Sequence, residues 1–158
     1  MLRYAFAGHN HSDDFRLNYA SGSPALLSRL NPSVSPVFGN NPAFVKYTYS
    51  PATGEIGDYL VYRVDVPEEK SSAFNPSWKP EYSFAATYHQ PAFTPASFNA
   101  LVKRLLEAPA VRQKYMQYNK VSSTKYPLKE DQWYFYCCSL GNPTEENYIK
   151  CLFSQTLD

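Results

Sequence analysis

The chain lacks several sequence features that would by themselves assign it to a protein class. It has no apolar run near the roughly 20 residues needed to cross a bilayer, and residues 1–7 are too short for a secretory signal. A net charge of +1 gives no electrostatic basis for binding a nucleic-acid polymer. Neither a GxSxG turn nor a glycine-rich phosphate loop occurs. We therefore expect no transmembrane segment, no nucleic-acid partner and no serine-hydrolase chemistry.

The order of secondary-structure signals predicts strands first and helices afterwards. With 158 residues the chain can form one domain with a real core. This order indicates an α/β protein, α+β within this chain, or the second half of a larger α/β sandwich with a helical tail. We divide it into residues 1–66 with the strands, a linker over 67–80 and a helical subdomain over 81–158.

The strand signals are apolar or alternating runs bounded by turn residues. Pro51 and Gly54 supply turn chemistry between two runs rich in tyrosine and valine, which predicts a β-hairpin. One face of its second strand carries Tyr59 and Val61 and the other carries Leu60 and Tyr62; one is expected to be core and the other at least partly covered. A proline-rich loop precedes the hairpin. The predicted strands are 3–8, 15–19, 25–30, 43–49 and 56–66, and the loop is 31–42.

Helical periodicity begins after residue 81. Thr94 is a good N-cap and Pro95 suits the first helical position, which predicts a helix ending near Pro109. The run 133–138 is apolar nearly all round, so we expect its helix to be buried. Further helices are predicted over 111–119, 129–140 and 144–152.

The strongest chemical signal is Gly8-His9-Asn10-His11, at the end of the first strand. In extended backbone, side chains two residues apart leave on the same side, so His9 and His11 could converge on one ion or two neighbouring ions. Gly8 would let the backbone turn sharply. The alternative is a pair of surface or structural histidines. Zinc takes about four ligands, so two imidazoles alone do not complete a site.

Residues 8–15, GHNHSDDF, resemble the last metal-binding motif of the calcineurin-like metallophosphoesterases. More closely, they are similar to the acid sphingomyelinase and sphingomyelinase-like phosphodiesterase family. The similarity continues through 31–35, NPSVS, and 39–44, GNNPAF. It implies the C-terminal half of a metallophosphoesterase β-sandwich, followed by a helical C-terminal subdomain. The family's Asp-x-His and Gly-Asn-His segments do not occur here, so the resemblance implies an N-terminal catalytic half as partner.

The resemblance also implies the chemistry. The complete enzyme would hold two zinc ions and hydrolyse a phosphodiester, sphingomyelin or nucleotide-like, through a metal-activated hydroxide. His9 would bind one metal and His11 the other, no catalytic residue would lie within this chain, and the chain alone would be inactive. We interpret Asp13 and Asp14 as carboxylates that order the loop, not as ligands. His89 is interpreted as a surface or capping residue.

Two asparagines and three cysteines leave alternatives open. Asn40 and Asn41 could line a pocket or only make turns. Taken alone, the three cysteines could be buried free thiols of a reducing compartment. The resemblance implies a disulfide between Cys138 and Cys151, with Cys137 packing as a small apolar residue. It further implies a secreted or lysosomal complete protein.

Two other functions remain open from the sequence. The chain could be a truncated, non-catalytic binding or regulatory product, or a gene fragment without function. It could also belong to another class of metallophosphoesterase, such as a nucleotidase or a purple acid phosphatase, that shares only the GHxH pattern with this sequence. Absence of a link between Cys138 and Cys151 would favour that second alternative.

Overall fold

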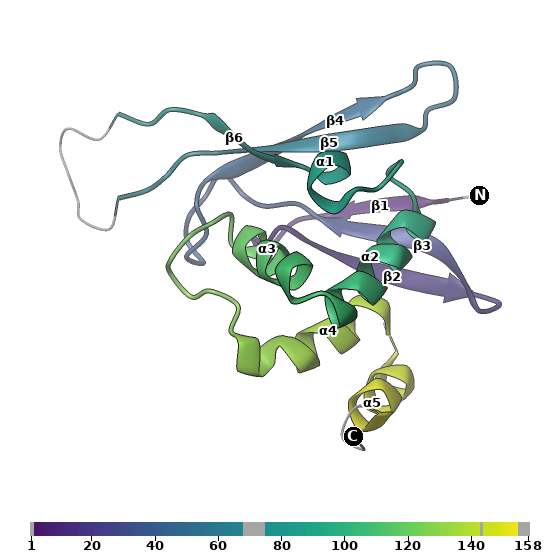
Figure 1. The fold of residues 1–158 in the computed structure, drawn as a ribbon. Helices are drawn as coiled ribbons and strands as arrows, with labels where there is room; N and C mark the ends of the chain where they lie inside the picture. Colours follow the sequence, from purple (N-terminus) through teal and green to yellow (C-terminus); the bar gives the residue numbers. More distant parts are fainter. Residues whose placement is uncertain (1, 68–74, 143, 155–158) are drawn as a thin grey trace.

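Two three-stranded sheets organise the part of the chain that the computed structural model describes, residues 2–67, 75–142 and 144–154. Figure 1 shows them stacked above one another, with most helices gathered below and beside the lower sheet. The expected mixed α/β class is confirmed.

The first sheet contains the three strands predicted closest to the N-terminus. β1 (Tyr4–Ala7) lies parallel to β3 (Ser23–Leu30), and β3 pairs antiparallel with β2 (Asp14–Ala20). Ser21 and Gly22 both have positive φ, 50° and 76°, which matches the tight turns that join twisted antiparallel strands. The loop with the two histidines therefore joins an edge strand to the opposite edge of the same sheet.

The second sheet begins with the predicted hairpin. β4 (Ala43–Tyr49) and β5 (Ile56–Arg63) pair antiparallel, and the Gly54 amide donates to the Ser50 carbonyl at 2.8 Å within the turn. In β5, Tyr59 and Val61 are 3% and 0% exposed. The face of this strand that carries Tyr59 and Val61 is therefore the core face.

A third strand of this sheet, β6 (Lys79–Ser83), was not predicted. The sequence indicated a linker up to Pro80 and helix from Glu81, and that prediction is wrong at this segment. A proline has no backbone N–H to donate to the hydrogen bonds between strands, but an edge strand such as β6 tolerates it. The pairing register shifts at this point, where Pro80 lies opposite Tyr62. Residues 68–74 of the predicted linker lie outside the described residues.

The helices follow the predicted capping signals closely. The Thr94 hydroxyl accepts from the Ser97 amide at 3.1 Å, and Pro109 starts the following helix at its first position.

The prediction that 133–138 is buried all round is wrong at Phe135, which is 54% exposed. No helix in the described residues combines the length and apolar content needed to cross a bilayer. The helices are α1 (Phe84–Tyr88), α2 (Pro95–Glu107), α3 (Pro109–Asn119), the short η1 (Glu130–Gln132), α4 (Trp133–Gly141) and α5 (Glu145–Ser154).

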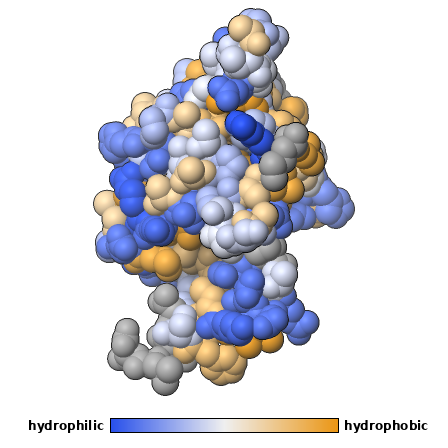
Figure 2. All heavy atoms as spheres, turned by 90° about the vertical axis from the view of Figure 1, so that its right-hand side faces the viewer, coloured by the Kyte–Doolittle hydropathy of each residue, from blue (hydrophilic) through white to orange (hydrophobic). Residues whose placement is uncertain are grey.

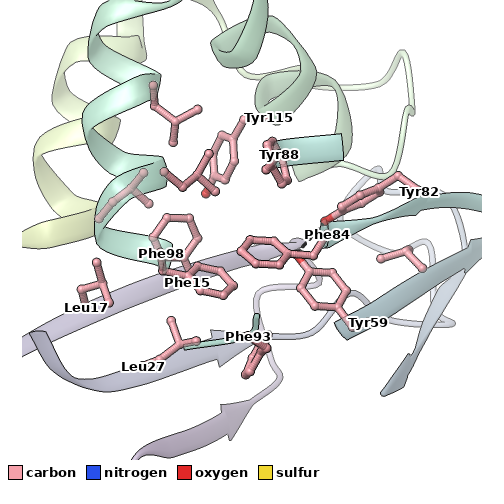
Figure 3. Close-up of a cluster of buried hydrophobic side chains, with 14 of the residues drawn as sticks. Phe15, Leu17, Leu27, Tyr59, Tyr82, Phe84, Tyr88, Phe93, Phe98 and Tyr115 are labelled. Carbon is pink, nitrogen blue, oxygen red and sulfur yellow. Dashed lines mark hydrogen bonds between the residues drawn. The ribbon is translucent and has the colours of Figure 1, made fainter. Parts of the chain in front are cut away.

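The core is built from aromatic rings supplied by both sheets and by α1 and α2 (Figure 3). Phe84 stacks on Phe98 with ring centroids 4.4 Å apart, and Phe15 meets Phe98 edge-on at 4.8 Å. Tyr59 of β5 stacks on the other side of this group, against Phe84 at 5.4 Å. Because these rings come from segments distant in sequence, the sheets and the first two helices share one core.

Cys138 of α4 and Cys151 of α5 form a disulfide, which confirms the pairing implied by the resemblance. This link joins α5 to the rest of the fold, since none of the residues of α5 is buried. Figure 1 shows α5 set apart from the body, and in Figure 2 it forms the lower lobe. Ile149 and Phe153 are 40% and 68% exposed on it.

The remaining cysteine, Cys137, is free and buried, as expected. Burial raises the pKa of its thiol to about 11. A shift of about two units leaves roughly 100-fold less thiolate near pH 8, and the thiolate is the form that reacts. We expect iodoacetamide to label Cys137 at pH 8 at least that much more slowly in the native chain than in urea. Equal rates in the two states, followed by mass spectrometry, would contradict the buried placement.

Candidate metal-binding loop

The loop between β1 and β2 does not have the extended geometry that the sequence predicted. His9 and His11 have positive φ, 81° and 51°. The prediction that both side chains leave an extended backbone on the same side is therefore wrong. Gly8 does not make the turn either, because its φ is not positive and a Cβ there would meet open space. Such backbone conformations cost about 1–3 kcal/mol each in non-glycine residues and persist where the surroundings impose them.

His11 is held in one orientation by the proline-rich loop. Its Nδ1 lies 2.9 Å from the Ser35 carbonyl oxygen, and its ring packs on Phe38 with centroids 4.8 Å apart. A carbonyl can only accept, so Nδ1 carries the proton and donates. In a neutral imidazole this leaves the lone pair on Nε2, which is the form that binds metals.

Both histidines line one hollow of about 570 Å³ near the ends of β1 and β4. Phe6, Phe44 and Val45 give it an apolar wall. The structure therefore brings the two predicted ligands to one place. Among the described residues, however, no group of three or more histidine, cysteine, aspartate or glutamate side chains is arranged to hold a metal ion.

Asp13 lies away from this hollow and is fully engaged with the core. Its carboxylate forms a buried ion pair with Arg29 and accepts from the Tyr82 hydroxyl at 2.8 Å. Burial raises the pKa of Asp13, and the Arg29 guanidinium opposes that shift. Arg29 also lies over the Tyr59 ring, 4.6 Å from its centroid. These bonds fit a carboxylate that orders the loop.

Asp14 is the centre of a second buried cluster. It accepts from the Phe15 amide at 2.7 Å and from Arg16 Nη1 at 2.6 Å, and the hydroxyls of Tyr115 and Tyr136 also donate to it. Burial raises the pKa of the Tyr115 hydroxyl well above its usual value, and the Asp14 charge adds to this effect. The two tyrosines come from α3 and α4, so the helices fix the strand that leaves the histidine loop.

The turn after α3 contacts both loops of the site. The Asp13 amide donates to the Asn119 carbonyl at 2.9 Å, and Lys120 Nζ donates to Ser12 Oγ at 3.0 Å. On the other side, the Asn41 side chain donates to the Val121 carbonyl at 2.9 Å. Partial burial lowers the pKa of Lys120. Residues 119–121 thus hold the histidine loop and the proline-rich loop together.

The remaining candidates have structural roles. The Asn40 side chain donates to the Ser33 and Ser35 carbonyls, both at 3.1 Å, so it shapes the loop that holds His11. Neither Asn40 nor Asn41 lines the hollow of the histidines. His89 is exposed and caps α1 in the left-handed conformation, as interpreted from the sequence.

Sequence reasoning missed the partners that hold the loop. Arg29 sits in a strand predicted from its apolar neighbours, and a lone arginine in such a run was the available signal for a buried ion pair. Tyr82, Tyr115 and Asn119 carry no comparable local signal, because their partners lie 69 or more residues away in sequence.

The fold and the loop together define a class: a mixed α/β module that carries two histidines in a constrained loop between β1 and β2 of its first sheet. Residues 26–157 match the family described as the acid sphingomyelin phosphodiesterase C-terminal region. The chain therefore belongs to this family. This assignment and the Cys138–Cys151 disulfide argue against the alternative that the chain belongs to another class of metallophosphoesterase and shares only the GHxH pattern.

Curated relatives from several organisms agree with this assignment. Acid sphingomyelinase-like phosphodiesterase 3b of mouse is 27% identical over 157 residues, covering 93% of this chain and 34% of the relative. The human protein of the same name is 27% identical over 159 residues, covering 94% and 35%. Sphingomyelin phosphodiesterase B of Dictyostelium discoideum is 24% identical over 162 residues, covering 94% and 25%. The chain thus spans about a third or less of the length of these relatives.

Proposed function

We propose that this chain contributes His9 and His11 as zinc ligands to the metal centre of a phosphodiesterase that hydrolyses sphingomyelin or a nucleotide-like phosphodiester. The observation that carries the proposal is that both histidines line one hollow in a loop constrained by buried bonds. The family assignment and the names of the relatives, a sphingomyelin phosphodiesterase and acid sphingomyelinase-like phosphodiesterases, support the reaction class.

The donor set of this chain fits zinc in kind but not in number. His11 is in the tautomer that leaves Nε2 for a metal, and His9 is exposed beside it. Because zinc takes about four ligands, the others would come from an N-terminal catalytic half, which we propose as the partner. Zinc bound there would lower the pKa of a water molecule and clamp phosphoryl oxygens.

The chain's own residues would orient and shield this centre. The Ser35 carbonyl would keep the His11 ring fixed, and Phe38 would limit its rotation. The apolar side of the hollow, with Phe6 and Phe44, would exclude water from one side of the bound diester. We further propose a secreted or lysosomal location for the complete protein, supported by the disulfide, since such links persist in oxidising compartments.

Zinc titration of the chain tests this proposal. We expect the isolated chain to bind less than one equivalent of zinc tightly and to show no phosphodiester turnover, because about four ligands are needed. The weak binding that remains should fall by about tenfold or more in a His9→Ala/His11→Ala variant, measured by calorimetry. His89→Asn is the matched control, because asparagine tolerates the left-handed cap, and it should bind as the parent does.

Two outcomes would contradict the proposal. One is tight stoichiometric zinc with turnover of a phosphodiester by the isolated chain. The other is zinc binding that the double histidine variant leaves unchanged.

A further inference from the structure

A second hollow, of about 480 Å³, lies against the same loop and also reaches His9. Among the residues that the structure describes, two cationic side chains, Arg16 and Lys120, line this second hollow, and none lines the first. Asn10 and Ser12 add polar groups from the loop. The two hollows therefore meet at His9 but differ in character, since the first has a largely apolar wall and the second is basic.

The balance of charge in the second hollow is positive. Among the described residues, Asp14 is the one carboxylate that lines it, and this group is buried and engaged by Arg16 and by two tyrosine hydroxyls. Two cations and one carboxylate give 2 − 1 = +1. In the described part of the chain Lys120 forms no ion pair, and its bond to Ser12 Oγ uses one of the three N–H donors of an ammonium.

The guanidinium of Arg16 has further donors as well. Its Nη1 donates to Asp14 at 2.6 Å and to the Phe15 carbonyl at 2.6 Å, and the group carries five N–H bonds in all. Its side chain is 30% exposed, so a ligand can approach it. Half-buried cations with spare donors bind oxyanions through charge-assisted hydrogen bonds.

We propose that Lys120 and Arg16 form a phosphate subsite next to His9, and that it prefers a phosphomonoester dianion to a phosphodiester monoanion. This rests on the proposed function, in which a diester is hydrolysed at the histidines. There, the water oxygen bonds to phosphorus, the bond to the leaving oxygen breaks, one water proton ends on the leaving alcohol, and the other is largely released to solvent. The phosphate that remains becomes a monoester, whose charge at pH 7 is about −1.5 to −2, against about −1 for the diester. A subsite with two cations would hold this product more strongly than the substrate.

Titration of the metal-free chain with inorganic phosphate and with dimethyl phosphate, followed by amide chemical shifts, tests the subsite. We expect saturable shifts at Asn10 and Ser12, with phosphate bound about tenfold more tightly than dimethyl phosphate. Lys120→Met keeps most of the side-chain volume and should weaken phosphate binding by about tenfold. Lys114→Met, on the exposed side of α3, is the matched control and should bind as the parent does.

Lys120→Arg keeps the charge and should retain binding, which separates lost charge from lost packing. Unchanged phosphate affinity in Lys120→Met would overturn the subsite, and equal affinity for both anions would overturn its preference. His9→Ala/His11→Ala without metal should still bind phosphate. The two proposals can fail separately. If the double histidine variant still binds zinc as the parent does, and Lys120→Met loses phosphate binding, the proposed metal site is refuted and the phosphate subsite is supported.

Discussion

Replacing Arg29 with methionine is expected to lower the free energy of unfolding by about 3–5 kcal/mol. The side chains of Arg29 and Asp13 are 1% and 3% exposed, so the variant would leave a buried carboxylate without its partner. It would also remove the cation above the Tyr59 ring. Urea denaturation followed by tyrosine and tryptophan fluorescence measures the change.

Arg3→Met is the matched control for this prediction. Arg3 pairs with Glu55, but the two side chains are 63% and 62% exposed, and exposed pairs contribute about 0–1 kcal/mol. A loss below about 1 kcal/mol in Arg29→Met would show that the buried pair does not hold the fold. Because Asp13 follows the histidine loop directly, we also expect the amide signals of Asn10 and Ser12 to shift in Arg29→Met alone.

The parts of the fold that sequence predicted well have local causes. The hairpin of β4 and β5 follows from the turn residues between them, and α2 follows from Thr94 and Pro95. β6 was missed because it depends on pairing with β5 across a connection of more than ten residues, while its own sequence carries a proline. Local signals therefore located strands and caps, but not the third strand of the second sheet.

The site shows the same limit. The pattern of two histidines located the loop, yet its conformation differs from a strand end because contacts from far along the chain impose it. Tyr115 and Tyr136 reach Asp14 from 101 and 122 residues away, and Asn119 reaches Asp13 from 106. No local pattern specifies such partners, so the sequence predicted the chemistry of the loop better than its geometry.

Replacing Cys138 and Cys151 together with alanine is expected to release α5 while the core stays folded. None of the residues of α5 is buried, so its order depends on the link to α4 across 13 positions. Closing a loop of that size stabilises by about 3 kcal/mol, which corresponds to roughly 100-fold in hydrogen-exchange protection. The α5 amides should lose protection by that factor, whereas amides near the aromatic core should not change.

Cys137→Ala is the control, because this buried cysteine of α4 forms no link and its loss leaves the disulfide in place. Its α5 amides should exchange as in the parent. Retained protection of α5 in the double variant would mean that other contacts hold the helix, with Ile149 and Phe153 as the first residues to test. Loss of core protection would mean that α4 itself needs the link, since Cys138 lies beside the residues with which α4 packs on β2.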